Sequence, residues 1–375
     1  MNQVLTPSLR FEEFKDNWES KNLKDVFELK YGKDHKHLNQ GIYPMLGSGG
    51  IMRYVDSYLY NQPSVLIGRK GTIDKPLFIT TPFWTVDTLF YTIIKQGQEP
   101  YFVYSLVQTI NWYKYNEATG VPSLNTSGIY SVPVYVPLIK EQQKIASFLT
   151  LVDSKISQLT EKHRLLKEYK KGVMQQIFSQ QLRFKDEDGE AFPEWEEKTI
   201  GNVMKESRIK GNGGDIAKKL TVRIWGKGVV AKKDDGKGSE NTQYYKRKAG
   251  QFIYGKLDFL NCAFAIIPEE LDGLESTLDL PSLDVSNAAN KFFILERVKQ
   301  KSFYKQFGDI ADGSRKAKRI NVSVFQSMPI NLPIKDEQDK IMNFLQSIDN
   351  KTDAVAQQVE QTKQFKKGLL QQMFV

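Results

Sequence analysis

Basic side chains interleaved with aromatic ones are the residues of this sequence whose types and spacing could do chemistry. They occur at 28–36, 67–72, 221–228 and 244–250, and a denser basic run spans 315–319. Lys and Arg neutralise phosphates, Arg recognises guanine edges, and aromatic rings stack on unpaired or flipped bases. For any single basic residue, a solvated surface charge is the alternative interpretation. The pattern predicts nucleic-acid contacts from Lys30, Tyr31, Lys33, Ser48, Arg69, Lys70, Thr72, Arg223, Trp225, Lys227, Lys246, Arg247, Arg315, Lys316, Lys318 and Arg319.

Patterns that would support catalysis are scarce. No glycine-rich phosphate loop of the G-x-x-x-x-G-K-S/T type occurs in the sequence. The stretch Asn61–Ser64 lacks the second proline and the aromatic residue of the amino-methyltransferase motif. His35 and His37 have His163 as the only other histidine, so a metal site is not expected and nucleophiles lack a paired base. We predict a chain that is not an enzyme and holds no metal or cofactor of its own.

The composition favours an acidic partner. The chain has 375 residues, 40% hydrophobic and 26% charged, with a formal net charge of +9 and an isoelectric point of about 9.2. Nucleic acid is the first candidate partner and an anionic membrane surface is the second. The single cysteine, Cys262, excludes a disulfide within the chain and favours the reducing cytoplasm. The first residues do not resemble a signal peptide, and no apolar run approaches the ~20 residues that span a bilayer.

A long internal repeat organises the positions of these residues. Asn125–Phe178 aligns without a gap with Asn321–Phe374, and 16 of the 42 positions from Pro137 onward are identical. "PLIKEQQKIASFLTLVDSKI" lies over "PIKDEQDKIMNFLQSIDNKT", and "KKGVMQQIF" over "KKGLLQQMF". A shorter match relates Leu9–Phe11 to Leu182–Phe184. Such self-similarity indicates a duplicated structural unit.

Each copy of the repeat predicts a long helix, at 137–178 and 333–375. A proline precedes each helix, acidic residues occupy the first turn, and apolar residues recur at heptad spacing. We expect the two helices to pack on each other in antiparallel orientation. Lys170 and Lys366 fall on the seam, where they either fix the register or let their long stems snorkel. The expected packing residues, toward the other helix and toward partner subunits, are Ile145, Leu149, Val152, Ile156, Leu159, Val173, Ile341, Leu345, Ile348, Val355, Val359 and Leu369.

Two segments that do not resemble each other lie between the helices. Residues 21–136 and 198–332 are rich in strand-forming and turn-forming residues, with strand candidates in 63–94, 250–268 and 290–298. Their net charges are +3 and +9, whereas the connectors 1–20 and 179–197 are acidic. The sequence thus predicts an α+β fold of two mixed domains separated by the two helices, with acidic connectors turned away from a polyanion.

This arrangement resembles the specificity (S) subunit of type I restriction–modification systems. The doubled helix starts, the "KKGVMQQIF/KKGLLQQMF" ends, the leads at 9–18 and 182–195, and "GSGGI" with "IGRKGTI" carry the resemblance. It implies two target-recognition domains, 21–136 and 198–332, each reading one half of a split DNA target. The helices would set the spacing and dock two modification subunits that methylate adenine. The run before the first helix lacks the basic residues that precede the second.

The resemblance also implies the partners and their cofactors. S-adenosylmethionine would belong to the modification subunits, and ATP and magnesium to restriction subunits that join them. A coiled-coil scaffold that binds proteins is the alternative, as is a self-sufficient modification enzyme. The repeat further predicts a circular plan with a pseudo-two-fold axis, in which Phe178 lies near Leu182–Phe184 and Phe374 lies near Leu9–Phe11.

Overall fold

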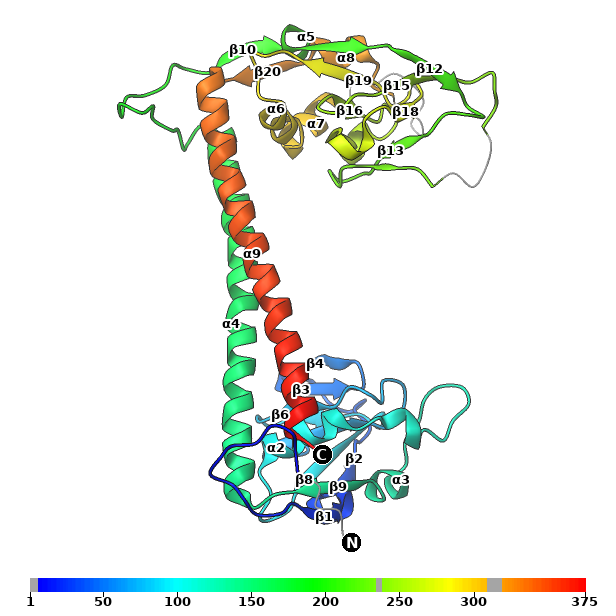
Figure 1. The fold of residues 1–375 in the computed structure, drawn as a ribbon, viewed down its shortest axis with the longest axis vertical. Coiled ribbons are helices and arrows are strands. Elements are labelled where there is room, and N and C mark those ends of the chain that lie inside the picture. The colour runs from blue at the N-terminus through cyan, green and yellow to red at the C-terminus, as the bar shows by residue number, and fades with distance from the viewer. Residues whose placement is uncertain (1–5, 234–237, 309–318) are drawn as a thin grey trace. The chain divides into compact units, whose positions relative to one another are not determined.

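The computed structural model describes residues 6–233, 238–308 and 319–375 (Figure 1). The chain divides into two compact units. Unit 1 comprises Met1–Arg164 and Ala354–Val375, and unit 2 comprises Leu165–Asp353. The unit boundaries fall inside the two long helices, α4 (Ile139–Phe178) and α9 (Lys335–Met373), so each unit holds part of both. The six-part division read from the sequence, which keeps each helix whole, stays a prediction.

The part of unit 1 that the structure describes forms three small sheets. Their strand orders are β1-β9, β2-β8-β5-β6 and β4-β3-β7. The strands are β1 (Glu19–Asn22), β2 (Phe27–Tyr31), β3 (Gln40–Gly47), β4 (Gly50–Val55), β5 (Ser64–Gly68), β6 (Leu77–Ile79), β7 (Trp84–Thr85), β8 (Leu89–Ile94) and β9 (Pro133–Val136). The shorter helices are α1 (Leu23–Val26), α2 (Pro100–Thr109), the 3-10 helix η1 (Trp112–Tyr115) and α3 (Thr126–Tyr130).

The described residues of unit 2 form four sheets. Their orders are β10-β20, β11-β19-β16-β17, β12-β15-β18 and β13-β14. The strands are β10 (Glu196–Thr199), β11 (Met204–Ser207), β12 (Lys210–Gly213), β13 (Leu220–Val222), β14 (Val229–Ala231), β15 (Gln243–Lys246), β16 (Phe252–Tyr254), β17 (Phe264–Ile266), β18 (Glu275–Ser276), β19 (Ser282–Val285) and β20 (Pro329–Leu332). The helices are α5 (Ile200–Val203), η2 (Phe259–Asn261), η3 (Glu269–Leu271), α6 (Lys291–Val298), α7 (Lys301–Gly308) and α8 (Val322–Ser327).

The structural repeat extends further than the sequence repeat. A strand before the short first helix pairs antiparallel with the strand before the long helix in both units, as β1 with β9 and β10 with β20. The four-stranded sheets then match position by position, as β2-β8-β5-β6 and β11-β19-β16-β17. The segments 21–136 and 198–332 were expected to differ. Their sequences do, but their main sheets are connected in the same way.

One predicted strand is a helix. Residues 290–298, expected as a strand because of their apolar and aromatic content, form α6. Asn290 is the N-cap, and its side chain accepts hydrogen bonds from the backbone N–H groups of Phe292 and Phe293. Phe293, Ile294 and Val298 are buried in the core of unit 2. The cap and the spacing of these three residues outweigh the strand preference of a short apolar run.

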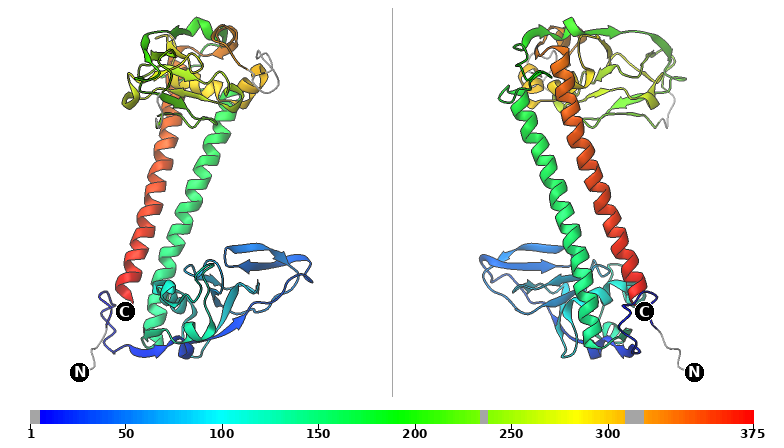
Figure 2. Two further views of the ribbon diagram at one scale, coloured as in Figure 1. Left: turned by 90° about the vertical axis from the view of Figure 1, so that its right-hand side faces the viewer. Right: turned by 60° about the vertical axis from the view of Figure 1, so that its left-hand side comes forward.

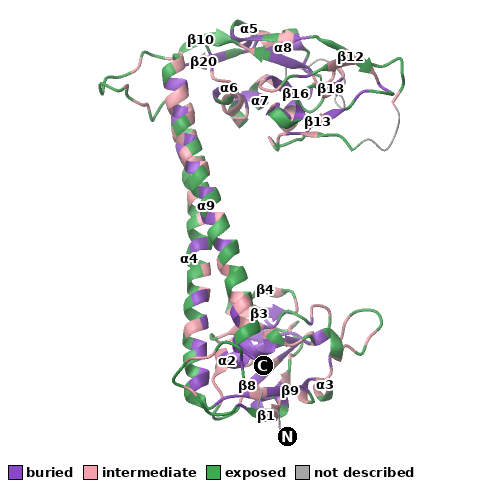
Figure 3. Ribbon diagram, viewed as in Figure 1, coloured by how far each residue is buried: buried purple, intermediate pink, exposed green. Residues whose placement is uncertain are grey.

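Buried residues recur along both long helices (Figure 3). The predicted packing residues are buried, with the exception of the half-buried Ile156. In unit 1, Ile145, Leu149 and Val152 share a core with Leu369 and Met373, and in unit 2 Val173 and Ile177 share one with Ile341 and Leu345. Segments of α4 and α9 lie side by side in each unit (Figure 2). Because these seam side chains are covered within the chain, any partner subunit must bind other, exposed residues.

The two seam lysines form ion pairs. Lys366 Nζ lies 2.7 Å from Asp153 Oδ2 in unit 1, and Lys170 Nζ lies 2.6 Å from Asp349 Oδ1 in unit 2. Asp153 and Asp349 occupy equivalent positions in the sequences of α4 and α9, as the two lysines do. The two helices therefore pair in the same register in unit 1 and in unit 2. The pairing is antiparallel, as predicted. The lysines therefore pair with aspartates of the other helix and do not merely extend to solvent, and we expect these pairs to define the register.

A buried glutamate anchors the start of one long helix in each unit, that of α4 in unit 1 and that of α9 in unit 2. Glu141 is 2% exposed and accepts hydrogen bonds from Arg10 Nε at 2.7 Å and Trp18 Nε1 at 3.2 Å. Glu337 is 0% exposed and accepts the same pair of bonds from Arg183 Nε at 2.9 Å and Trp195 Nε1 at 3.2 Å. A buried carboxylate needs such charge-assisted partners. The leads around Leu9 and Leu182 are thereby fastened to the helix starts.

Candidate nucleic-acid interface

In unit 1, the structure brings the predicted contacts Tyr31 and Arg69 together. Tyr31 ends β2, and Arg69 follows β5, two strands that both pair with β8. The Arg69 guanidinium lies 5.4 Å from the centroid of the Tyr31 ring, a cation–π contact. Arg69 also donates to the Asp87 carbonyl at 3.1 Å, and the Tyr31 hydroxyl lies 2.9 Å from Thr126 Oγ1. An exposed aromatic ring and an arginine are thus held in one place.

The other predicted residues of unit 1 lie around this pair. The turn after β5 is tight, because a side chain at Gly68 would meet the Thr72 carbonyl at 2.1 Å. Ser48, in the turn between β3 and β4, approaches Gly71, where a Cβ atom would stand 3.2 Å from its Oγ. Lys70 is exposed. Exposed Lys33 and half-buried Lys30 lie on either side of Tyr31 in the sequence, and the hydrogen bond from Lys30 to Glu28 raises the pKa of the lysine.

In unit 2, the predicted residues Arg223, Trp225 and Lys227 form one hairpin tip. The tip joins β13 to β14 and is closed by a 2.8 Å hydrogen bond from the Arg223 N–H to the Gly228 carbonyl. All three side chains are exposed. Lys246, at the end of β15, is exposed as well. The tip is a basic loop with an aromatic ring at its centre.

The structure contradicts the prediction made for Arg247. This arginine was predicted to contact nucleic acid, but its side chain is 0% exposed. Its guanidinium donates to Ser276 Oγ at 2.7 Å, Ser282 Oγ at 3.1 Å and the Ser207 carbonyl at 3.1 Å. Burial lowers the pKa of the Arg247 side chain to about 10. Alternation along a strand explains the error, because neighbouring side chains point to opposite faces and Lys246 takes the exposed one.

Most of the basic run near 315–319 lies outside the described residues. Arg315, Lys316 and Lys318 are among the residues whose structure is not described. Arg319 is half-exposed, and its Nη1 lies 3.2 Å from Asp279 Oδ1. An exposed pair of this kind contributes little to stability, so the arginine can exchange its partner at small cost.

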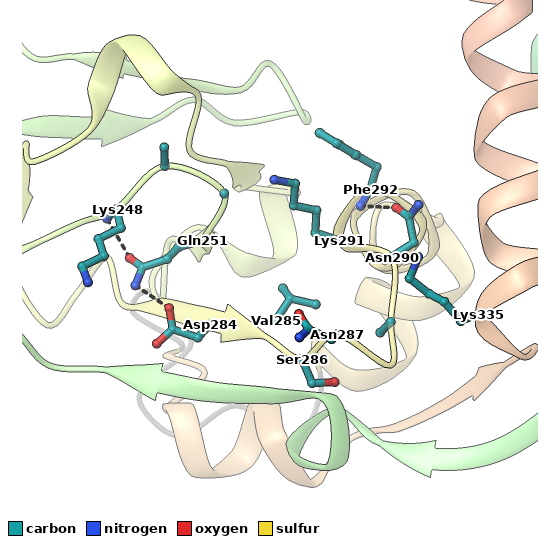
Figure 4. A pocket seen from close by; sticks show the side chains of 13 residues that line it. Lys248, Gln251, Asp284, Val285, Ser286, Asn287, Asn290, Lys291, Phe292 and Lys335 are labelled. Carbon is teal, nitrogen blue, oxygen red and sulfur yellow. Dashed lines mark hydrogen bonds between the residues drawn. The ribbon is translucent and has the colours of Figure 1, made fainter.

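Unit 2 also has a lysine-lined hollow that sequence reasoning missed (Figure 4). Its volume is 590 Å³, and its wall includes Lys248, Lys291, Lys335 and the amide side chains of Gln251 and Asn287. Gln251 Nε2 donates to Asp284 Oδ1 at 2.8 Å, while Lys335 pairs with Asp339. The lysines are far apart in sequence, so no local pattern could reveal the hollow.

An exposed surface near the end of each long helix is present in two equivalent copies, one in each unit. In unit 2 it consists of Tyr169, Lys171, Gly172, Gln175 and Gln176, and in unit 1 of the equivalent Phe365, Lys367, Gly368, Gln371 and Gln372. We refer to it as the duplicated helix face. Tyr169 is 53% and Phe365 is 55% exposed. A hollow of 370 Å³ adjoins the copy in unit 1, lined by Lys367, Leu370, Gln371 and Phe374 among others.

The glycines of the duplicated helix face have no structural requirement within the chain. A Cβ atom at Gly172 or Gly368 would have no neighbour within 4 Å, and neither residue has a positive φ. Glycine inside a helix costs about 1 kcal/mol relative to alanine. Contacts within the described residues do not explain why this cost occurs at the same place in both copies.

No cluster in the described residues has the composition of a metal site. Residues 6–233, 238–308 and 319–375 contain no group of three or more His, Cys, Asp or Glu side chains suited to a metal ion. Cys262 is buried, as expected, and burial raises the pKa of its thiol. Across the same ranges, no helix combines the length and apolar character needed to cross a bilayer.

The geometry of two basic, aromatic-bearing units on shared long helices agrees with the comparison to protein families. The model of the "Type I restriction modification DNA specificity domain" matches residues 15–168 and 279–364. The chain belongs to this family. The match to this specificity family includes the unit 1 residues from Lys30 to Thr72, whereas the hairpin tip of unit 2 lies outside the matched ranges.

Individual relatives agree with the family assignment. A protein of Methanocaldococcus jannaschii, named as the specificity subunit of type I restriction enzyme MjaX, is 23% identical over 366 residues, which cover 92% of this chain and 82% of the relative. The type I restriction enzyme EcoprrI specificity subunit of Escherichia coli is 22% identical over 165 residues, or 42% of this chain and 41% of the relative.

Solved structures of specificity subunits share the fold. The S subunit of a type I restriction-modification system from M. genitalium superposes with a TM-score of 0.60 at 13% identity, covering 99% of both chains. The HsdS subunit from Thermoanaerobacter tengcongensis gives a TM-score of 0.51 at 13% identity, covering 95% of this chain and 96% of the other. The predicted fold class, two α+β domains with two long antiparallel helices, is confirmed.

Proposed function

We propose that this chain is the non-catalytic DNA-recognition subunit of a cytoplasmic type I restriction–modification complex. Each unit would read one half of a bipartite duplex target, unit 1 around Tyr31 and Arg69 and unit 2 around Arg223, Trp225 and Lys246. The observation that carries the proposal is that the two units share a sheet scheme and a set of anchors but differ in these exposed residues. A shared frame with different reading surfaces suits a split, asymmetric target.

The long helices would set the gap between the half-sites. Both are continuous, and each contributes to both units, so their length would limit how far apart two reading surfaces can lie. DNA-binding dimers control half-site spacing in the same physical way. Here one chain carries both halves.

The duplicated helix face would dock two copies of the modification subunit. Its two copies present an aromatic residue, a lysine, two glutamines and a glycine in the same order. Glycine in a helix lets a second backbone come close, and a surface present twice suits two copies of one partner. S-adenosylmethionine would be bound by those subunits, which methylate adenine, and ATP with magnesium by restriction subunits joined to them.

Modification mapping tests the reading role. The chain is expressed with its modification subunit, and methylated adenines are mapped across the host genome. A paired substitution in unit 1, Tyr31→Ala with Arg69→Ala, should relax or abolish one half-site and leave the other unchanged. Arg223→Ala with Lys246→Ala should affect the opposite half. If either pair altered both halves equally, separate reading by the two units would be wrong.

Helix length tests the spacing role. Insertion of one heptad into each long helix should lengthen the unread gap and preserve both half-sites. A changed half-site with an unchanged gap would contradict the spacer function. The purified chain alone should bind DNA weakly and methylate nothing, so methylation without a partner would contradict the non-catalytic assignment.

Glycine substitution tests the docking role. Gly172→Ala and Gly368→Ala should each raise the free energy of unfolding by about 1 kcal/mol, because the added methyl group meets no atom of the chain. The same substitutions should weaken co-purification of the modification subunit, and the double variant should weaken it most. Ser157→Ala, exposed on α4 away from this face, is the matched control. Unchanged partner binding in the double variant would exclude docking at this face.

A further inference from the structure

Trp225 has an unusual backbone conformation for a large residue. Its φ is 64°, and the following Gly226 and Gly228 have φ values of 63° and 86°. A left-handed conformation is ordinary for glycine but strained for a bulky side chain. Within the described residues, only Gln180 and Cys262 are other non-glycine residues with positive φ. Such strain persists where the surroundings impose it, and it is concentrated at functional sites.

The backbone around Trp225 is held by hydrogen bonds, not by its side chain. The Trp225 N–H donates to the Asn261 carbonyl at 2.7 Å, and the Gly226 N–H donates to the Cys262 carbonyl at 2.8 Å. Below the tip, Leu220, Val222 and Val229 belong to a buried cluster with Ile253 and Ala263. The tip is therefore a rigid projection that presents its central side chain.

The indole ring of Trp225 makes no ring or cation–π contact with the residues that the structure describes. The residue is 56% exposed, and no aromatic ring of the described chain packs on it. Trp18, Trp84 and Trp112 are 6% exposed or less, and the half-buried Trp195 donates its N–H to Glu337. The neighbouring Ile224 is 39% exposed, so an apolar edge about two side chains wide faces solvent.

We propose that Trp225, supported by Ile224, is a wedge that stacks on a base of the duplex at a step whose own stacking has been opened. The proposal rests on the proposed function and assigns a mode of DNA contact to the unit 2 hairpin tip. It makes Trp225 a site of DNA deformation, in contrast to Tyr31 of unit 1, whose ring is occupied by Arg69 and Phe90.

The charge around the tip identifies nucleic acid as the occupant. Arg223 and Lys227 flank the ring, are exposed, and form no ion pair within the described residues. Lys299, whose aliphatic stem lies beside Gly226, adds a third cation, which is paired with Glu296. A strained apolar edge between unpaired cations fits the proteins that insert apolar side chains between base steps while cations hold the phosphates. A modified base must also leave the stack, which leaves an opened step to be filled.

Three substitutions separate the wedge from a structural role. Trp225→Gly removes the ring and relieves the left-handed strain, so the thermal unfolding midpoint should stay the same or rise. Its affinity for the mapped target duplex, measured in complex with the modification subunit, should fall by about 5- to 150-fold, the range for loss of one stacked aromatic. Trp225→Phe keeps a ring and should retain most of the affinity. Ile216→Ala, which removes another exposed apolar side chain of unit 2, should leave affinity unchanged.

A scan of abasic sites locates the opened step. Target duplexes with one abasic position each are bound by the wild type and by Trp225→Gly. At one position in the unit 2 half-site, the missing base should remove the difference between the two proteins, because no base remains to stack on the ring. Equal affinity of Trp225→Gly and wild type on the intact target would overturn the wedge. A wild-type complex that binds no duplex would instead refute the proposed function and the wedge with it.

Discussion

The backbone N–H of Leu9 donates a 2.9 Å hydrogen bond to the carbonyl of Gln372, although 363 residues separate them in the sequence. The equivalent bond in unit 2 runs from Leu182 to Gln176 at 3.1 Å. The aromatic contacts agree, since Phe374 packs on Phe102 at 5.3 Å and Phe178 packs on Phe293 at 5.6 Å between ring centroids. The predicted proximity of Leu9 to the end of the second repeat is confirmed. In unit 2 a short stretch of chain links the helix end to Leu182, whereas in unit 1 the helix end and Leu9 are held together only by noncovalent contacts.

A circular permutant follows from this closure. Val375 joined to Met1 by a short flexible linker, with the chain reopened between Ser179 and Gln180, should fold with the helix content of the parent. The new ends lie in an exposed turn, where chain breaks are best tolerated. Circular dichroism and thermal unfolding measure the outcome. Reopening between Glu168 and Tyr169, inside α4, is the control and should destabilise the protein; equal destabilisation by both openings would contradict the closure.

The Asp–Lys pairs on the seam predict a charge-exchange result. Lys366→Asp alone places a second carboxylate next to that of Asp153. The repulsion should lower the free energy of unfolding by about 1–3 kcal/mol. The exchange variant, Lys366→Asp with Asp153→Lys, should recover most of that loss because the pair re-forms in the opposite sense. Urea denaturation of the two variants and of Asp153→Lys gives the coupling energy. A coupling near zero would show that the pair does not define register.

The sequence was sufficient to predict the frame because the frame is duplicated. Proline before the helix, heptad spacing and a shift of 196 residues fixed both long helices to within two residues of their observed starts at Ile139 and Lys335. The heptad spacing also placed Lys170 and Lys366 on the seam between the two helices. The partner aspartates were visible as identical positions, but only the antiparallel register paired each with a lysine of the other helix.

The interiors of the two domains could not be predicted to the same depth. The shared sheet order has no counterpart in residue identity, since strands of three to six residues specify little beyond alternation. Residues 290–298 were misassigned because an eight-residue helix and a buried strand have similar composition, and the Asn290 cap decided between them. Arg247 looks like its neighbour Lys246 in sequence, and only the strand face distinguishes a buried guanidinium from an exposed ammonium.

The caps of α2 and α6 predict a pH-dependent difference. Glu99 caps α2, where its equivalent Asn290 caps α6, and burial raises the pKa of the Glu99 carboxyl above its usual value. A raised pKa in the folded state stabilises the protein below the unfolded pKa, and this stabilisation is lost as pH rises through the folded pKa. Glu99→Asn does not titrate. Its stability relative to wild type should therefore increase between pH 4 and pH 7.

The reverse substitution is the control for the cap. Asn290→Glu places a carboxylate beside Asp339, whose Oδ1 accepts a 2.7 Å hydrogen bond from Asn290 Nδ2. This variant should lose stability relative to wild type over the same pH range. Thermal unfolding at pH 4, 5, 6 and 7 compares the two. A pH-independent difference for Glu99→Asn would mean that the Glu99 carboxyl has the same pKa in the folded and unfolded states.

Adjacent residues 246 and 247 should give opposite phenotypes. Arg247→Met removes a fully buried guanidinium and leaves Ser276, Ser282 and the Ser207 carbonyl without their donor, so the free energy of unfolding should fall by about 3 kcal/mol. Lys246→Ala removes an exposed ammonium, and stability should change by less than about 0.5 kcal/mol. Lys246→Ala should instead weaken DNA binding and reduce the slope of log affinity against log salt by about 1, the value for one lost phosphate contact. Chemical denaturation and binding titrations at several salt concentrations measure both. A Lys246→Ala variant with an unchanged salt slope would remove this lysine from the DNA interface.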